Sequence, residues 1–77
     1  MSNQPRTLAD LQLWLLKEYR CDQYHDYDLA PDHISRLGCY EETASEIAQR
    51  LSETWIVKQV FKVEDSGWVR INILKRD

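Results

Sequence analysis

The chain has 77 residues, of which 43% are apolar, and its ten Lys and Arg face thirteen Asp and Glu for a formal net charge of -3. A chain this short buries only about 60% of the surface that it exposes when unfolded, so it has one small core, and its apolar content excludes a disordered chain. No apolar run approaches the roughly 18 residues of a membrane-spanning helix. We therefore expect a cytoplasmic protein with a disordered tail over residues 1–6, a single domain over residues 7–77 and no membrane partner.

The first predicted helix begins after Thr7, which is a suitable N-cap residue. Asp10 then occupies the third helical position, as in an acidic variant of the capping box. Apolar residues follow at spacings of three and four, which places them on one helix face: Leu8, Leu11, Leu15 and Tyr19. We expect this helix to pack centrally in the domain, and part of its wide apolar face is also available for a homodimer contact.

Residues 21–32 are rich in Asp and Tyr, and predict a connection with a short extended piece at residues 27–29. A proline and an aspartate then suit the first turn of a helix, and Ile34 and Leu37 supply an apolar pair three residues apart before a glycine. These features predict a short second helix over residues 31–37.

The third predicted helix covers residues 40–54. Its apolar positions have the i, i+3, i+4, i+7 spacing of an amphipathic helix, and they are Ala44, Ile47, Ala48 and Leu51.

After residue 54 the apolar period changes from helical to alternating, which is typical of strands. Two alternating runs over residues 57–63 and 68–74 flank a short loop that ends in Gly67. We expect a hairpin with Gly67 in the left-handed conformation. The alternative is a helix pair over residues 43–69 followed by one strand.

The predicted fold is therefore α+β, with three helices followed by a C-terminal β-hairpin. The run Ile34-Ser-Arg-Leu37-Gly38, followed by Thr43-Ala-Ser45, Leu51 and Trp55-Ile-Val57-Lys58, resembles the winged helix-turn-helix superfamily, in particular small repressor-like winged-helix domains. The resemblance implies a DNA-binding transcription regulator whose third helix enters the major groove of double-stranded DNA and whose hairpin, or wing, contacts phosphates.

The expected DNA contacts follow from this resemblance and from the distribution of charge. Residues 1–54 carry five basic and ten acidic side chains, whereas residues 55–77 carry five and three, so the positive field lies at the C-terminal end. The candidate DNA-binding residues are Arg36, Ser45, Gln49, Arg50, Lys58, Lys62, Arg70 and Lys75.

Three carboxylates on the predicted third helix, Glu41, Glu42 and Glu46, would repel a polyanion. They favour a second function class, a protein–protein interaction module that binds a basic protein surface, as in an adaptor or a mobile-element-type inhibitor.

The Cys and His residues all lie within nineteen positions, at Cys21, His25, His33 and Cys39. Two thiolates and two imidazoles are suitable zinc ligands, but the closely spaced Cys pair of zinc fingers is missing. We expect buried cysteines, loop histidines, and neither a metal nor another cofactor. The sequence also lacks the common catalytic motifs, so we expect no enzyme.

The three tryptophans are expected to contribute to packing. Trp14 and Trp55 lie beside apolar neighbours, which predicts core packing. Trp68 follows the predicted hairpin tip, and we expect it to close the hairpin against Phe61 or Val63.

Overall fold

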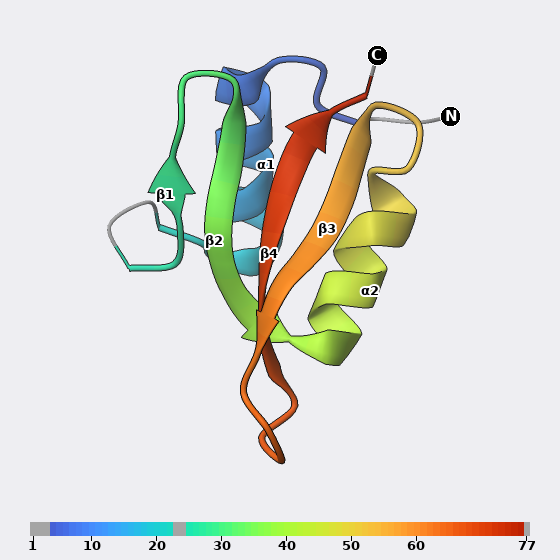
Figure 1. The fold of residues 1–77 in the computed structure, drawn as a ribbon. Helices are drawn as coiled ribbons and strands as arrows, with labels where there is room; N and C mark the ends of the chain where they lie inside the picture. The colour runs from blue at the N-terminus through green and yellow to red at the C-terminus, as the bar shows by residue number, and fades with distance from the viewer. Residues whose placement is uncertain (1–3, 23–24, 77) are drawn as a thin grey trace.

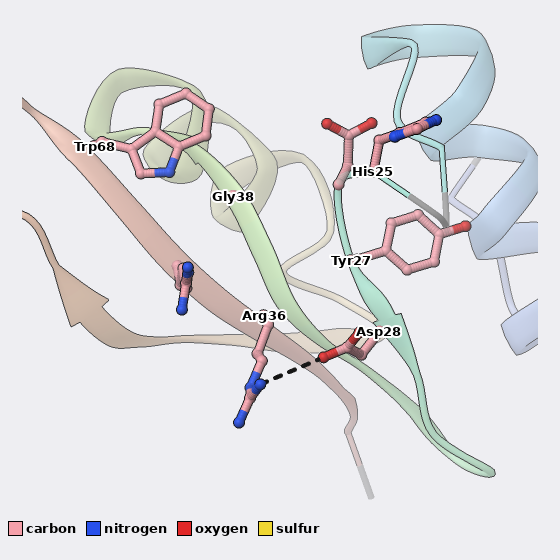
Figure 2. Close-up of a pocket in the computed structure, with 8 residues that line it drawn as sticks. His25, Tyr27, Asp28, Arg36, Gly38 and Trp68 are labelled. Atoms are coloured by element: carbon pink, nitrogen blue, oxygen red, sulfur yellow. Dashed lines mark ion pairs between the residues drawn. The ribbon is translucent and has the colours of Figure 1, made fainter.

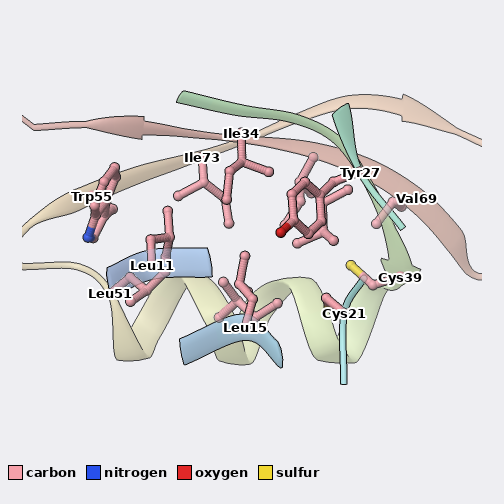
Figure 3. Close-up of a cluster of buried hydrophobic side chains, with 13 residues drawn as sticks. Leu11, Leu15, Cys21, Tyr27, Ile34, Cys39, Leu51, Trp55, Val69 and Ile73 are labelled. Atoms are coloured by element: carbon pink, nitrogen blue, oxygen red, sulfur yellow. The ribbon is translucent and has the colours of Figure 1, made fainter. Parts of the chain in front are cut away.

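The structure is a computed structural model that describes residues 4–22 and 25–76. Its elements in chain order are α1 (Leu8–Tyr19), β1 (Asp28–Leu29), β2 (His33–Tyr40), α2 (Glu41–Arg50), β3 (Trp55–Lys62) and β4 (Trp68–Lys75). The four strands form one antiparallel sheet in the order β1-β2-β4-β3. Both helices pack on the same side of this sheet, so the molecule has two layers (Figures 1 and 3).

The prediction of an α+β fold with three helices before a hairpin is wrong, because the chain has two described helices and a four-stranded sheet. The predicted helix over residues 31–37 belongs instead to β2, so the segment matched to the second helix of a winged-helix domain is a strand. The cause is a β-bulge: Ile34 pairs with Ile73 and Leu37 with Ile71, so β2 has one extra residue. Both apolar side chains therefore point to the core at a spacing that imitates a helix.

Other predicted elements are confirmed. The Thr7 side chain accepts a hydrogen bond from the Asp10 backbone N–H at 3.1 Å and caps α1. The amphipathic helix predicted over residues 40–54 is α2, and the predicted hairpin is β3–β4, with Gly67 at φ 75°. The alternative helix pair is wrong, because β3 replaces its second helix. In the predicted connection, β1 forms the extended piece, and residues 23–24 lie outside the described residues.

The chain from β2 through α2 to β3 forms a split β-α-β unit. Both strands run antiparallel to β4, which lies between them, and α2 makes the crossover. The strand β2 therefore lies beside β4, which is distant from it in the sequence, and β4 separates β2 from β3 (Figure 1).

The core lies between the sheet and the two helices (Figure 3). Its fully buried members come from every long element, and they are Leu11, Leu15, Ile34, Leu37, Ile47, Leu51, Trp55, Val69, Ile71 and Ile73. The Trp55 indole N–H donates to the Pro5 carbonyl at 2.8 Å, and this bond fixes the chain before α1 against the start of β3. Core packing of Trp55 is thus confirmed, and Trp14 packs against the core while partly exposed. Of the predicted tail, residues 1–3 lie outside the described residues.

Candidate nucleic-acid interface on the open face of the sheet

The sheet has one face that the helices leave uncovered. In β4 the buried residues alternate with outward ones, which are Trp68, Arg70, Asn72 and Leu74. The strand register places further outward side chains beside them: Gly38 and Tyr40 of β2, and Ile56, Lys58 and Phe61 of β3. Together with Arg36 at the bulge, these residues define the open face.

The three long strands contain no Asp or Glu, although they carry five of the chain's ten Lys and Arg. Three of these cations, Arg36, Lys58 and Arg70, belong to the open face. Lys58 and Arg70 form no ion pair with any carboxylate of the described residues. The acidic side chains of residues 4–22 and 25–76 lie on the helices, the turns and β1, so the open face is a local positive surface on a protein of negative net charge.

The other two strand cations point away from this face. The Lys62 ammonium pairs with Glu41 of α2 at 2.8 Å. The Lys75 ammonium donates to the Arg6 carbonyl and lies 5.1 Å from the centre of the Trp55 ring. These contacts tie the sheet to α2 and to the N-terminal segment, so the structure separates both lysines from the three cations of the open face.

Trp68 lies across Gly38 on the open face (Figure 2). A Cβ at Gly38 would be 2.9 Å from Cζ2 of the indole, so the ring can keep this position only over a glycine and would have to shift for any other residue. The Tyr40 ring meets the indole edge-on, with 5.0 Å between the ring centres and 85° between the planes. The Trp68 carbonyl accepts a hydrogen bond from the Val63 N–H at 2.9 Å, so these two residues face each other at the end of the hairpin. The expected packing of the Trp68 ring against Phe61 or Val63 stays a prediction. The indole is held against the strand and remains 37% exposed.

Phe61 is the third aromatic side chain of the open face and is about half exposed. The Arg70 guanidinium lies 5.6 Å from the centre of its ring, a favourable cation–π arrangement. An aromatic ring and a cation therefore lie opposite each other on β3 and β4.

A hollow of about 280 Å³ borders the open face between β4, β2 and the segment before β1. Its lining residues are His25, Asp26, Tyr27, Asp28, Arg36, Gly38, Trp68 and Arg70 (Figure 2). Arg36 enters it from the β-bulge, where its backbone has φ 57° and its N–H donates to Asn72 Oδ1 at 3.0 Å. Its guanidinium pairs with Asp28 at 3.8 Å, and both side chains are about two-thirds exposed. An exposed ion pair of this length is weak.

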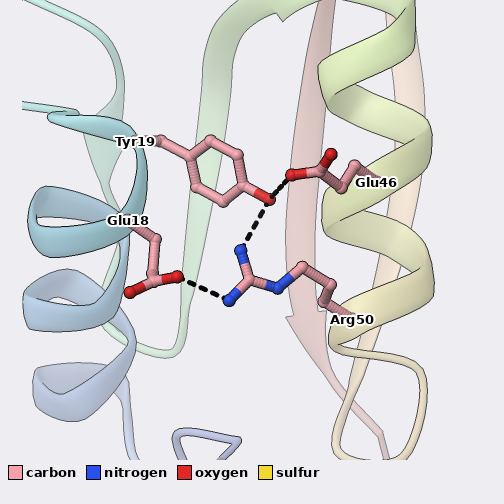
Figure 4. A network of polar contacts seen from close by, with 4 residues as sticks. All are labelled: Glu18, Tyr19, Glu46 and Arg50. Carbon is pink, nitrogen blue, oxygen red and sulfur yellow. Dashed lines mark hydrogen bonds and ion pairs between the residues drawn. The ribbon is translucent and has the colours of Figure 1, made fainter.

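The predicted contacts from α2 lie on the other layer of the molecule. Ser45 and Gln49 are exposed on α2, which covers the face opposite to the open face. Arg50 is bound to α1: its guanidinium is 2.6 Å from Glu18 and donates to the Tyr19 hydroxyl at 3.0 Å (Figure 4). These contacts raise the pKa of Arg50. The structure therefore does not bring the eight predicted DNA-binding residues together.

The three carboxylates of α2 differ in their contacts. Glu46 accepts a hydrogen bond from the Tyr19 hydroxyl at 2.5 Å (Figure 4), and Glu41 pairs with Lys62. Burial, and then this bond to Glu46, raises the pKa of Tyr19. Glu42 is exposed beside the hairpin loop.

The Cys and His side chains do not form a metal site. Cys21 and Cys39 are buried, and burial raises the pKa of each thiol to about 11, so both stay protonated at neutral pH. His33 contacts Asp32 at 2.8 Å, which lowers the pKa of that carboxyl, and His25 is exposed. Within residues 4–22 and 25–76, no group of three or more His, Cys, Asp or Glu side chains could hold a metal ion.

No protein-family model, curated protein or solved structure matches this chain. Function must therefore be argued from the site itself. Among the described helices, none is long and apolar enough to cross a membrane.

Proposed function

We propose that the protein binds single-stranded nucleic acid on the open face of the sheet. The observation that carries this proposal is the combination of exposed aromatic rings with two cations, Lys58 and Arg70, that pair with no carboxylate of the described residues, on three long strands that contain no Asp or Glu. Exposed sheets and grooves that bind single strands use this combination, because aromatic rings stack on bases and cations contact phosphates.

A single strand suits this surface better than a duplex. Bases reach aromatic rings on a sheet only when they are unstacked from their own neighbours. Duplex binding in the winged-helix manner would bring phosphates to the hairpin tip, which carries Glu64 and Asp65, and to α2, which carries Glu41, Glu42 and Glu46. These carboxylates repel phosphates, and the one Arg of α2 is bound to α1.

The expected affinity is modest and depends on salt. Three phosphate contacts, from Arg36, Lys58 and Arg70, predict that log K falls with log salt with a slope of about -2, since each contact contributes about 0.7 for single strands. A stacked base contributes about 1–3 kcal/mol, which keeps part of the binding insensitive to salt.

Fluorescence anisotropy of a labelled, mixed-sequence 12-nucleotide single strand and of its duplex tests the proposal at low and near-physiological salt. The single strand is expected to bind more tightly than the duplex. Replacing Lys58 and Arg70 together by Gln is expected to lower the affinity at least tenfold. Lys17→Gln together with Arg20→Gln is the matched control, because it also removes two positive charges, here from exposed positions at the end of α1 in the helix layer, and is expected to leave binding nearly unchanged.

Two results would overturn the proposal. The first is the absence of binding to the single strand even at low salt. The second is an equal loss of affinity in the open-face variant and in variants of the helix layer, because binding would then depend on overall charge and not on the open face.

A further inference from the structure

The hollow beside Arg36 has a volume of about 280 Å³ and combines an aromatic ring with two guanidinium groups, those of Arg36 and Arg70. It opens on the open face, and its floor is the Gly38 strand with the Trp68 indole across it. Indole atoms Cζ2, Cε2 and Nε1 lie within 3.3 Å of the position that a Cβ of Gly38 would take, and 37% of Trp68 stays exposed to contact a base. Tyr40 supports the ring edge-on and limits its rotation.

The cations of the hollow lie close to this ring. Arg70 follows Trp68 by two residues on the same face of β4, about 6.6–6.8 Å along the strand, and it pairs with Gly38 across the ladder. Arg36 reaches the same hollow from the other strand because the bulge, with its left-handed backbone, redirects the side chain. A phosphate between the two guanidinium groups would accept charge-assisted hydrogen bonds from both.

One wall of the hollow is acidic. The Asp26 carboxylate already accepts a hydrogen bond from the Asp22 backbone N–H at 2.6 Å. The Asp28 carboxylate pairs with Arg36 at 3.8 Å (Figure 2), and both of these side chains are mostly exposed. A phosphate that approaches Arg36 would therefore lie near Asp28 and compete with it for the guanidinium.

We propose that this hollow binds one nucleotide of the strand, with its base stacked on Trp68, its phosphate between Arg36 and Arg70, and Asp28 as the group that competes with the phosphate for Arg36. The inference rests on the proposed function and adds to it the place of a base, the place of a phosphate, and an internal competitor that limits affinity.

Adenosine 5′-monophosphate is a suitable probe, and adenosine and inorganic phosphate are its two halves. In ¹H–¹⁵N spectra of the full chain at 150 mM salt, the nucleotide is expected to shift the Trp68 indole N–H and the backbone amides of Gly38 and Arg70. It is also expected to bind more tightly than either half. Shifts caused equally by inorganic phosphate alone would overturn the stacking part of the inference.

Asp28→Asn tests the competition. The variant is expected to bind the nucleotide about two- to fivefold more tightly, because an exposed ion pair of this kind no longer opposes the phosphate. Asp32→Asn is the matched control: it removes the same charge from a neighbouring position that contacts His33 and does not line the hollow. Unchanged or weaker binding by Asp28→Asn, or an equal gain in the control, would overturn the inference.

Failure of the inference and failure of the proposed function give different results. If the 12-nucleotide strand binds the open face while the nucleotide leaves Trp68 and Gly38 unshifted, the hollow is not a subsite and the proposed function stands. If the nucleotide binds in the hollow and the strand does not bind, the hollow is a small-molecule site and the proposed function fails. If neither binds, both are wrong.

Discussion

A substitution of Arg50 tests whether this cation stabilises the contact between α1 and α2 or binds nucleic acid. The change Arg50→Met keeps the apolar stem of the side chain and removes the guanidinium, which holds α1 to α2. That group forms an ion pair with Glu18 at 2.6 Å, donates to the Tyr19 hydroxyl at 3.0 Å and lies 4.7 Å from the centre of the Trp14 ring.

The expected loss of stability in the Arg50→Met variant follows from these contacts. A partly exposed ion pair contributes about 0.2–1 kcal/mol, a hydrogen bond about 0.5–1.5 kcal/mol, and an exposed cation–π contact about 0.5–1 kcal/mol. Because the three share one group and are not additive, we expect a loss of about 1–2 kcal/mol in the free energy of unfolding. For a domain of this size, each kcal/mol corresponds to about 4–8 °C in Tm.

Urea unfolding, followed by tryptophan fluorescence, measures this loss, and anisotropy with the 12-nucleotide strand measures binding. Gln49→Met, on the exposed surface of the same helix, is the control and is expected to stay within about 0.5 kcal/mol. Arg50→Met is expected to destabilise the protein and leave strand affinity unchanged. Unchanged stability together with a large loss of strand affinity would refute the structural role of Arg50 and place the nucleic acid on the helix layer.

Three further predictions follow from single contacts. Gly38→Ala places a Cβ 2.9 Å from the Trp68 indole; because that ring is partly exposed and can shift, stability is expected to change by less than about 1 kcal/mol while strand affinity falls severalfold, as urea unfolding and anisotropy would reveal. Trp55→Phe leaves the Pro5 carbonyl without its buried donor and is expected to cost about 2–4 kcal/mol in urea unfolding; a cost below about 1 kcal/mol would contradict this packing. Burial raises the pKa of the Cys21 and Cys39 thiols in the folded chain to about 11, from an ordinary value of 9.0. Between pH 9 and pH 11 the unfolded chain therefore binds fewer protons than the folded chain, so the free energy of unfolding is expected to fall as the pH rises through this range. Replacing both cysteines by Ala is expected to flatten that decline, as urea unfolding at several pH values would measure.

The elements whose boundaries or periodicity depend on residues close in the sequence could be predicted from the sequence. Thr7 and Asp10 mark the start of α1, the apolar period of α2 is regular, and Gly67 supplies the left-handed residue of the hairpin. The strand β2 could not be predicted in the same way, because the bulge between Ile34 and Leu37 gives a strand the apolar spacing of a helix. A bulge forms against a partner strand, and here that partner lies more than thirty residues later in the chain.

The open face was predicted only in part, for a similar reason. Arg36, Lys58 and Arg70 were among the candidate residues, but their common position depends on β4 lying between β2 and β3. The contact of Trp68 with Gly38 joins residues thirty positions apart and leaves no local pattern. The lack of any Asp or Glu in residues 33–40, 55–62 and 68–75 was the signal in the sequence that could have indicated this surface.

The most direct test of nucleic-acid binding on the open face is to map an unlabelled 12-nucleotide single strand onto the protein by ¹H–¹⁵N chemical-shift changes. The expected result is a set of shifts concentrated at Gly38, Lys58, Arg70 and the Trp68 indole, with little change in α1 and α2. Shifts concentrated in α2, around Ser45 and Gln49, or no shifts at saturating strand concentration and low salt, would contradict it.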